Sequence, residues 1–151
     1  NVLVKQILEK YVQWDRFSGK MGMIFVPKEI MDFLGMANYE QKFMMGQPFG
    51  IQKLAEIARA LVSKPKLILL DEPAAGMNDQ ETREIANIIR DIRDELGVTV
   101  LLVEHDMNLV MSISDQICVL ESGKVIALGE PNIVKDDPKV IETYLGEPVD
   151  A

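Results

Sequence analysis

Two adjacent carboxylates, Asp71 and Glu72, end a short apolar run and are well placed to do chemistry. The run covers residues 67–70, and Pro73 then interrupts backbone pairing because it has no N–H to donate. A short apolar run between breakers is typical of a buried strand in a parallel sheet. Such sheets bind ligands at the carboxyl ends of their strands, so Asp71 and Glu72 are candidate site residues. Taken alone, an Asp-Glu pair is more often two solvated acids.

A second apolar run, residues 98–103, is followed by the only histidine of the chain, His105. The two runs are joined by one crossover helix, so we expect them to be neighbouring parallel strands with both carboxyl ends at one edge. Asp71, Glu72 and His105 then converge. Two carboxylates and a histidine could hold a divalent metal, position a water or contact a phosphate. A lone histidine at a strand end is more often a structural residue.

A third stretch, residues 47–61, predicts a helix with Pro48 and Gly50 just before it. Four apolar residues keep helical spacing: Leu54, Ile57, Ala58 and Leu61. A glycine at this place lets a ligand approach free backbone N–H groups, where the helix dipole favours an anion. The same pattern also fits an ordinary helix with a turn in front of it.

The elements that must position these residues alternate between strand and helix. The long crossover helix begins at Asn78, which forms a capping-box-like pair with Glu81, and Gly97 closes it. Its predicted buried stripe is Ile85, Ile88, Ile89, Ile92 and Leu96. Further helices are expected at 27–34, 106–113 and 138–145, a strand at 116–120, and a hairpin strand at 125–128. This order predicts an α/β fold with a parallel sheet, preceded by a mainly helical part that ends near Gly46.

Composition narrows the class of protein. A length of 151 residues suits one domain, and a net charge of -8 argues against nucleic-acid binding, which needs a basic face. The single cysteine, Cys118, lies in an apolar run, so we expect a buried core thiol and a reducing compartment. No apolar stretch is long enough to span a bilayer, which predicts a soluble, cytosolic chain unless a partner holds it at a membrane.

Together these motifs resemble the ATP-binding subunit of an ABC transporter. The resemblance is carried by residues 57–61 (Ile-Ala-Arg-Ala-Leu), by Asp71-Glu72-Pro73 after an apolar strand, and by His105 after the next strand. It covers residues 47–151, and residues 1–46 more weakly. Residues 48–50, 74–78 and 144–147 are similar to the importers of branched-chain amino acids and their urea-import relatives.

The resemblance implies a P-loop NTPase-like sheet and specific roles for residues. Asp71 would end the Walker B strand and order the Mg²⁺ shell, Glu72 would be the general base, and His105 would contact the γ-phosphate of ATP. The signature segment, residues 47–52, would meet ATP held by a second subunit. Its implied nucleotide-binding residues are Pro48, Phe49, Gly50 and Gln52. The D-loop at the dimer interface would comprise Ala75, Gly76, Met77 and Asn78.

The implied partners are a second ATP-binding subunit and transmembrane permease subunits, which would hold the chain at the cytoplasmic face of the membrane. Some residues depart from the family pattern. Gln47 and Phe49 replace the leucine and tyrosine of the importer signature, and Asn78 replaces an aspartate. The P-loop pattern Gly-x-x-x-x-Gly-Lys-Ser/Thr does not occur in the chain. The chain therefore resembles the C-terminal part of such a subunit: residues 1–46 from the helical subdomain, and 47–151 from the ATPase core.

Three hypotheses follow. The first is an importer ATPase fragment that binds ATP very weakly alone, because a P-loop supplies most N–H groups that cradle phosphates. The second is a non-catalytic interaction module that offers its signature and D-loop surfaces to a partner. The third, an unrelated metal-dependent phosphohydrolase, would need more acidic strand ends. Missing strands should also leave an apolar sheet edge or face open.

Overall fold

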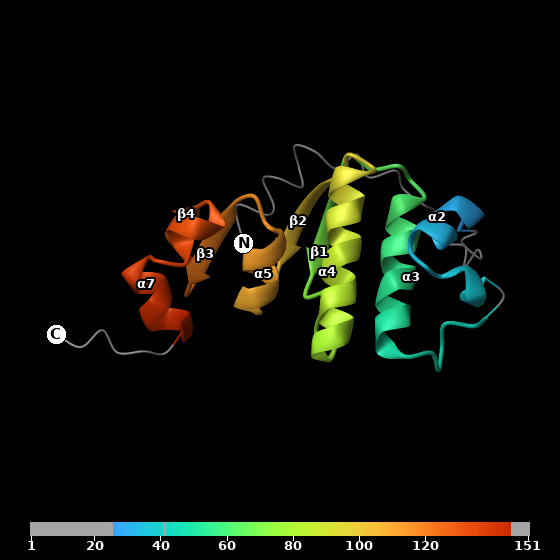
Figure 1. Ribbon diagram of the computed structural model, residues 1–151, viewed down its shortest axis with the longest axis horizontal. Coiled ribbons are helices and arrows are strands. Elements are labelled where there is room, and N and C mark those ends of the chain that lie inside the picture. Colours follow the sequence, from blue (N-terminus) through green and yellow to red (C-terminus); the bar gives the residue numbers. More distant parts are fainter. Residues whose placement is uncertain (1–25, 41, 146–151) are drawn as a thin grey trace.

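The computed structural model describes residues 26–40 and 42–145. Residues 1–25 of the predicted helical part, residues 1–46, lie outside these residues. Figure 1 shows α2, η1 and α3 at one end, α4 with β1 and β2 in the middle, and the β3–β4 hairpin with the last helices at the other end. The elements are α2 Lys28–Phe33, η1 Ala37–Tyr39, α3 Phe49–Leu61, β1 Leu67–Asp71, α4 Asp79–Asp94, β2 Thr99–Val103, α5 Met107–Ile113, β3 Ile117–Glu121, β4 Lys124–Gly129, α6 Pro131–Val134, α7 Pro138–Val140 and η2 Ile141–Leu145.

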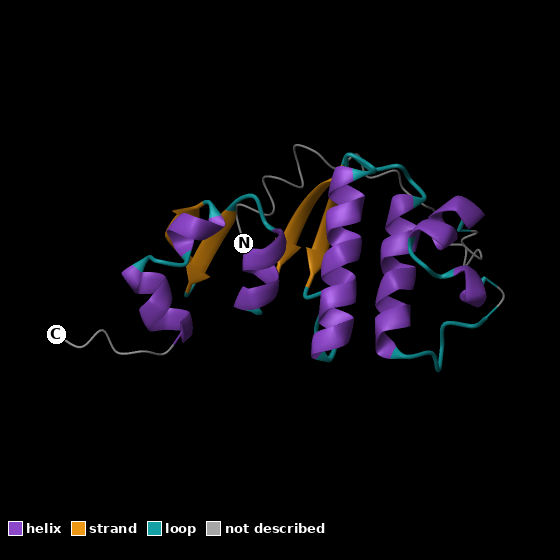
Figure 2. Ribbon diagram, viewed as in Figure 1, coloured by secondary structure: helices purple, strands orange, loops and turns teal. Residues whose placement is uncertain are grey.

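Strands β1 and β2 pair in parallel, as predicted, with Leu67 opposite Thr99 and Asp71 opposite Val103. Helix α4 connects them, stands beside them in Figure 2 and packs against β2. The sheet of β1 and β2 is buried on one face only. Ile68 and Leu70 belong to the core, whereas Leu69 is 39% exposed and Val103 is 51% exposed. An open apolar face of the sheet was expected, and it is present in the part of the chain that the structure describes.

Helix α4 begins with a complete capping box. The Asn78 side chain accepts hydrogen bonds from the backbone N–H groups of Gln80 and Glu81, and the Glu81 carboxylate accepts one from the N–H of Asn78. The predicted stripe is confirmed for Ile85, Ile89 and Ile92, which are buried, while Ile88 is half-buried. The prediction was wrong for Leu96, which is 46% exposed because it follows the last helical turn. Gly97 ends the segment at a φ of 63°.

Helix α3 begins at Phe49, two residues earlier than the sequence predicted. Pro48 is its N-cap and Phe49 its first residue, so Gly50 lies inside the first turn rather than before it. Pro48 has the extended, non-helical backbone of an N-cap, with φ −50° and ψ 146°, and the helical conformation begins at the next residue. Ile57, Ala58 and Leu61 face the core, where α2 packs against α3.

Strands β3 and β4 form an antiparallel hairpin, as predicted, but they make a separate two-stranded sheet. The expectation that β3 extends the parallel sheet was therefore wrong for the described residues. The turn explains the local pairing: Ser122 and Gly123 have φ values of 49° and 78°, a geometry typical of a tight two-residue hairpin connection. Strand β3 takes its partner from the next segment of chain and shows no pairing with β2.

Cys118 is exposed, which corrects the prediction of a buried thiol. The side chains of β3 alternate between two faces, and Ile117 and Val119 occupy the buried face against β4 and the last helices. Cys118 thus points to the opposite face, beside Leu128 of β4. The predicted C-terminal helix of residues 138–145 is present as α7 followed by one turn of π-helix, η2.

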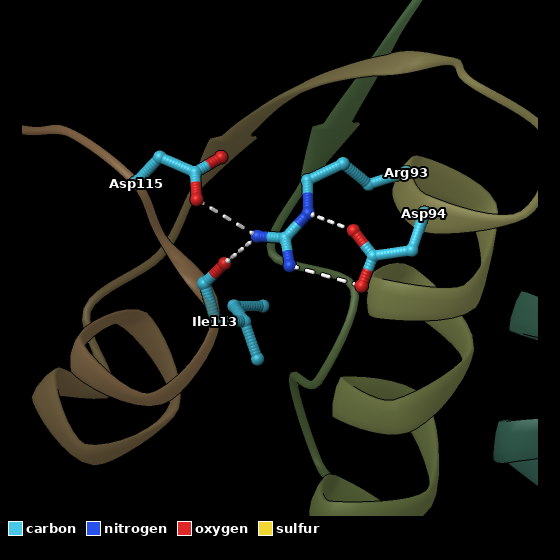
Figure 3. A network of polar contacts seen from close by, with 4 residues as sticks. All are labelled: Arg93, Asp94, Ile113 and Asp115. Atoms are coloured by element: carbon cyan, nitrogen blue, oxygen red, sulfur yellow. Dashed lines mark hydrogen bonds and ion pairs between the residues drawn. The ribbon is translucent and has the colours of Figure 1, made fainter.

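One arginine ties the end of α4 to the segment between α5 and β3 (Figure 3). The Arg93 guanidinium donates to both carboxylate oxygens of Asp94, at 2.7 and 3.1 Å. It also donates to the backbone carbonyl of Ile113 at 2.9 Å and to Asp115 at 3.1 Å. The Ile113 carbonyl lies in the last turn of α5, where carbonyls have no partner within the helix. Arg93 therefore fixes the position of α5 relative to α4.

Candidate functional site

The residues after β1 form a tight loop that one backbone hydrogen bond joins to the end of β2. The N–H of Glu72 donates to the carbonyl of Val103 at 2.9 Å, which extends the parallel pairing by one residue. Glu72 itself has a φ of 45°, a left-handed conformation that is uncommon outside glycine. Within the loop, Ala75 N–H donates to the Glu72 carbonyl, and Met77 N–H donates to that of Ala74. The chain thus turns sharply at the second carboxylate.

Glu72 and His105 come together at the shared edge of the two strands, as predicted. His105 Nδ1 lies 3.5 Å from Glu72 Oε1. Both side chains are open to solvent, with exposed fractions of 53% for Glu72 and 72% for His105, so a substrate could reach them. A carboxylate beside an imidazole can accept a proton from water while the imidazole contacts a second group.

Asp71 ends β1 and is exposed on the open face of the sheet. It lines a cleft of about 360 Å³ between β1 and α3. Lys53 of α3 lines the same cleft, which the sequence did not suggest. A lysine on an amphipathic helix is usually solvated, and only the packing of α3 beside β1 places this one near Asp71.

The predicted signature segment lies beside the predicted D-loop. A side chain added at Gly76 would meet the Phe49 ring at 4.0 Å, and one added at Gly50 would meet Met77 Cε at 3.8 Å. The Gln52 side chain does not point outward to a ligand. Its amide donates to the carbonyl of Gln47 at 2.8 Å and thereby holds the loop that precedes α3.

Two groups of residues therefore remain distinct in this chain. The strand-end group comprises Asp71, Glu72 and His105, and the surface group comprises residues 48–52 and 75–78. No hydrogen bond or ion pair joins residues 48–52 to the strand-end group among the residues that the structure describes. Each group forms a face of its own, and neither encloses a ligand by itself.

Sequence reasoning missed Glu104. Its carboxylate accepts hydrogen bonds from the N–H of Ala74 at 3.0 Å and from the N–H of His105 at 3.3 Å. Ala74 is 30 positions away along the chain. The only signal in the sequence was an acid directly before the histidine, and that alone does not identify a partner.

The acidic groups fit a magnesium ion that arrives with a phosphate ligand. Within the described residues, no three His, Cys, Asp or Glu side chains form a group that could hold a metal ion. Mg²⁺ keeps several waters and commonly binds one or two carboxylates together with substrate phosphates. A single exposed carboxylate at a strand end, such as Asp71, meets that requirement.

Comparisons with known proteins agree with the resemblance. The family model described as branched-chain amino acid ATP-binding cassette transporter matches residues 124–150. The high-affinity branched-chain amino acid transport ATP-binding protein BraF of Pseudomonas aeruginosa is 50% identical over 99 residues, which are 66% of this chain and 39% of BraF. LivG of Escherichia coli, which carries the same description, is 41% identical over 117 residues, which are 78% of this chain and 46% of LivG.

The chain is similar to the ATP-binding cassette transporter family. Within it, the matches above are to proteins of the branched-chain amino acid type, as predicted. The chain spans less than half the length of BraF and LivG, at 39% and 46%.

Solved cassettes share its fold and confirm the α/β class. The cassette MJ1267 in its ADP conformation superposes with a TM-score of 0.72 at 30% identity, covering 95% of this chain and 56% of MJ1267. A nucleotide-free cassette superposes with a TM-score of 0.71 at 31% identity, covering 95% of this chain and 56% of its own length. None of the helices that the structure describes has the length and apolar character needed to cross a membrane.

Proposed function

We propose that this chain supplies the hydrolytic half of an ATP site in an ABC importer, with branched-chain amino acids as the transported class. The observation that carries the proposal is the pair of Glu72 and His105, whose side chains lie 3.5 Å apart at the carboxyl ends of two parallel strands. The relatives named above support the substrate class. The proposed division is residues 1–46 in a helical subdomain and 47–151 in the ATPase core.

In the proposed reaction, Glu72 holds the attacking water and accepts its proton, and His105 donates a hydrogen bond to the γ-phosphate. Asp71 would hold a Mg²⁺ ion through its water shell, and that ion would supply positive charge close to the phosphate groups. Catalysis then comes mainly from positioning and charge stabilisation, because phosphoryl transfer asks for little covalent chemistry from the protein.

A phosphate cradle must come from elsewhere, because the 151 residues contain no P-loop. Asp71, Glu72 and Glu104 are all acidic, so they repel the triphosphate unless Mg²⁺ and further donors compensate. The N–H groups and the lysine of a P-loop are the natural source of such donors. We propose that a segment outside these residues completes both the site and the sheet, whose open face carries Leu69 and Val103.

The surface formed by residues 48–52 and 75–78 is the proposed contact with a second ATP-binding subunit. Phe49 is 49% exposed and Gly76 is exposed, and they stand next to each other. Transmembrane permease subunits are the proposed second class of partner, which would hold the protein at the cytoplasmic face of the membrane. No role in nucleic-acid binding is proposed, given the net charge of -8.

A second candidate function is an interaction module without catalysis. It is favoured by one observation: the surface of residues 48–52 and 75–78 is fully built within this chain, while the phosphate cradle is not. The two functions differ in whether Glu72 affects turnover once a P-loop is supplied.

The test is a chimera that joins the part of BraF preceding its matched region to this chain. We expect ATP hydrolysis by the chimera and none by the 151-residue chain alone. Glu72→Gln should lower turnover by about 10²–10⁴-fold, the usual contribution of a general base. Glu121→Gln, a change at an exposed carboxylate on β3, is the matched control and should leave turnover unchanged.

A chimera without ATPase activity would count against the proposal, and so would two further outcomes. Full turnover in the Glu72→Gln chimera would remove Glu72 from the chemistry and favour the interaction module. Micromolar binding of Mg-ATP to the 151-residue chain in calorimetry would contradict the need for an added phosphate cradle. Chimera turnover that Glu72→Gln abolishes and Glu121→Gln spares would support the hydrolytic role.

A further inference from the structure

One carboxylate links the loop after β1 to the candidate catalytic histidine. Glu104 Oε1 accepts from the N–H of Ala74, and Glu104 Oε2 accepts from the N–H of His105. Ala74 is buried and directly precedes residues 75–78, the proposed contact with a second subunit. Glu104 is itself half-buried, and both of its oxygens are engaged.

We infer that Glu104 is a positioning residue that sets the geometry of the Glu72–His105 pair. The inference deepens the proposed ATPase function and rests on it. Glu104 touches neither a substrate nor the reacting atoms, so it acts through the two segments that it joins.

The backbone conformation of Glu72 shows why the hydrogen bond from Ala74 to Glu104 is needed. Its φ of 45° is uncommon for a residue with a side chain, and such conformations persist only where the surroundings hold them. The loop is held at two points, by the bond from Glu72 N–H to the carbonyl of Val103 in β2 and by the bond from Ala74 N–H to Glu104, the residue after β2. Of these, only the second depends on a side chain, so it is the one that a substitution can remove.

The same carboxylate also reaches the histidine side of the pair. Its second oxygen holds the N–H of His105, whose ring lies 3.5 Å from Glu72. We therefore expect a shift of residues 75–78 to move the backbone of His105, because the Glu104 carboxylate is bonded to both segments. Binding of a second subunit to that segment would order the Glu72–His105 pair by this route.

The first test needs neither ATP nor a P-loop. In the nitrogen-15-labelled 151-residue chain, Glu104→Ala should raise the hydrogen-exchange rate of the Ala74 amide about tenfold, because a bond to a charged acceptor is lost. Glu104→Gln keeps one acceptor oxygen and should have a smaller effect. The ring signals of His105, the single histidine, should move in both variants. Glu121→Ala is the control and should change neither readout. Unchanged Ala74 exchange in Glu104→Ala would overturn the inference.

The second test separates positioning from simple stability. In the chimera with BraF, Glu104→Gln should lower kcat about tenfold at an unchanged KM for ATP and an unchanged melting temperature. A raised KM at full kcat, or a loss of kcat only in proportion to unfolded protein, would overturn a positioning role. If the chimera lacks ATPase activity altogether while Ala74 loses protection in Glu104→Ala, the proposed function fails and the link through Glu104 still stands.

Discussion

Replacing Arg93 with alanine tests how the end of α4 is held to the segment after α5. The guanidinium makes four polar contacts: two to Asp94, one to the Ile113 carbonyl and one to Asp115. Arg93→Ala removes all four at once. It also leaves the Ile113 carbonyl, near the end of α5, without its side-chain donor.

The expected cost follows from the exposure of each contact. The side chains of Asp94 and Asp115 are 58% and 78% exposed, and solvent-exposed ion pairs contribute about 0–1 kcal/mol. The bond to the Ile113 carbonyl has a charged donor but is partly open to water, so we assign it about 1 kcal/mol. Arg93→Ala should therefore lower the free energy of unfolding by about 1–2 kcal/mol. For a chain of this length that corresponds to a melting temperature about 2–8 °C lower.

The assay is urea denaturation followed by circular dichroism, with two companion variants. Arg93→Lys keeps the charge but not the planar fork, so it should recover only part of the loss. Arg90→Ala is the matched control on the same helix, because Arg90 donates only within α4, to Asn87 at 2.6 Å. Equal losses for Arg90→Ala and Arg93→Ala would refute the reasoning, since the contacts across to α5 would then contribute nothing.

The same variant gives a prediction about pH. The hydrogen bond from Arg93 lowers the pKa of Asp94 below its usual value of 3.8, and it raises the pKa of Arg93. An acid with a lowered pKa in the folded state stabilises the protein above its unfolded pKa and loses that effect as pH falls through the folded pKa. The stability difference between the parent chain and Arg93→Ala should thus be full near pH 5 and shrink below about pH 4. A difference independent of pH over this window would exclude the Asp94 contact as its source.

Three further changes test the fold. Asn78→Ala removes the capping box of α4 and should lower the free energy of unfolding by about 1 kcal/mol in urea denaturation, whereas Asn78→Asp should retain it. Ile92 is 0% exposed, so Ile92→Ala should lower the free energy of unfolding by about 2–5 kcal/mol in the same measurement, and Ile92→Val by about 1 kcal/mol. Cys118 should react with a thiol reagent without denaturant, and Cys118→Ser should shift stability by less than about 0.5 kcal/mol.

Local rules predicted well how the ends of β1 and β2 meet. Pro73 and the apolar run placed the end of β1, and the crossover rule brought the end of β2 beside it. Convergence of Glu72 and His105 then required no information beyond the order of elements. The capping box at Asn78 was equally predictable, because its donors and acceptors lie within one turn of each other.

The predictions that failed depended on neighbours outside the local pattern. Strand β3 was assigned to the parallel sheet because it follows β2 and a helix, but its hydrogen bonds go to β4. Cys118 lies in an apolar run that suggested full burial, yet alternate residues of a two-stranded sheet face opposite ways, and only one face is covered by the last helices. Apolar character alone does not say which face of a hairpin finds a partner.

The charges at the strand ends agree with the missing phosphate cradle that the sequence predicts. Asp71, Glu72 and Glu104 lie at the ends of two neighbouring strands, and the cation that shares a cleft with Asp71 is Lys53 of α3. Glu104 does not compete for a ligand, since its two oxygens already hold backbone N–H groups. In the proposed function, Asp71 and Glu72 are the acids that would act on a triphosphate, and both would repel it unless Mg²⁺ and backbone donors compensated for their charge. To bind a triphosphate, these acidic strand ends therefore need a phosphate cradle, whose hydrogen-bond donors offset the repulsion between carboxylates and phosphates. It follows that restoring such a cradle should do more for ATP affinity than any substitution within residues 66–78.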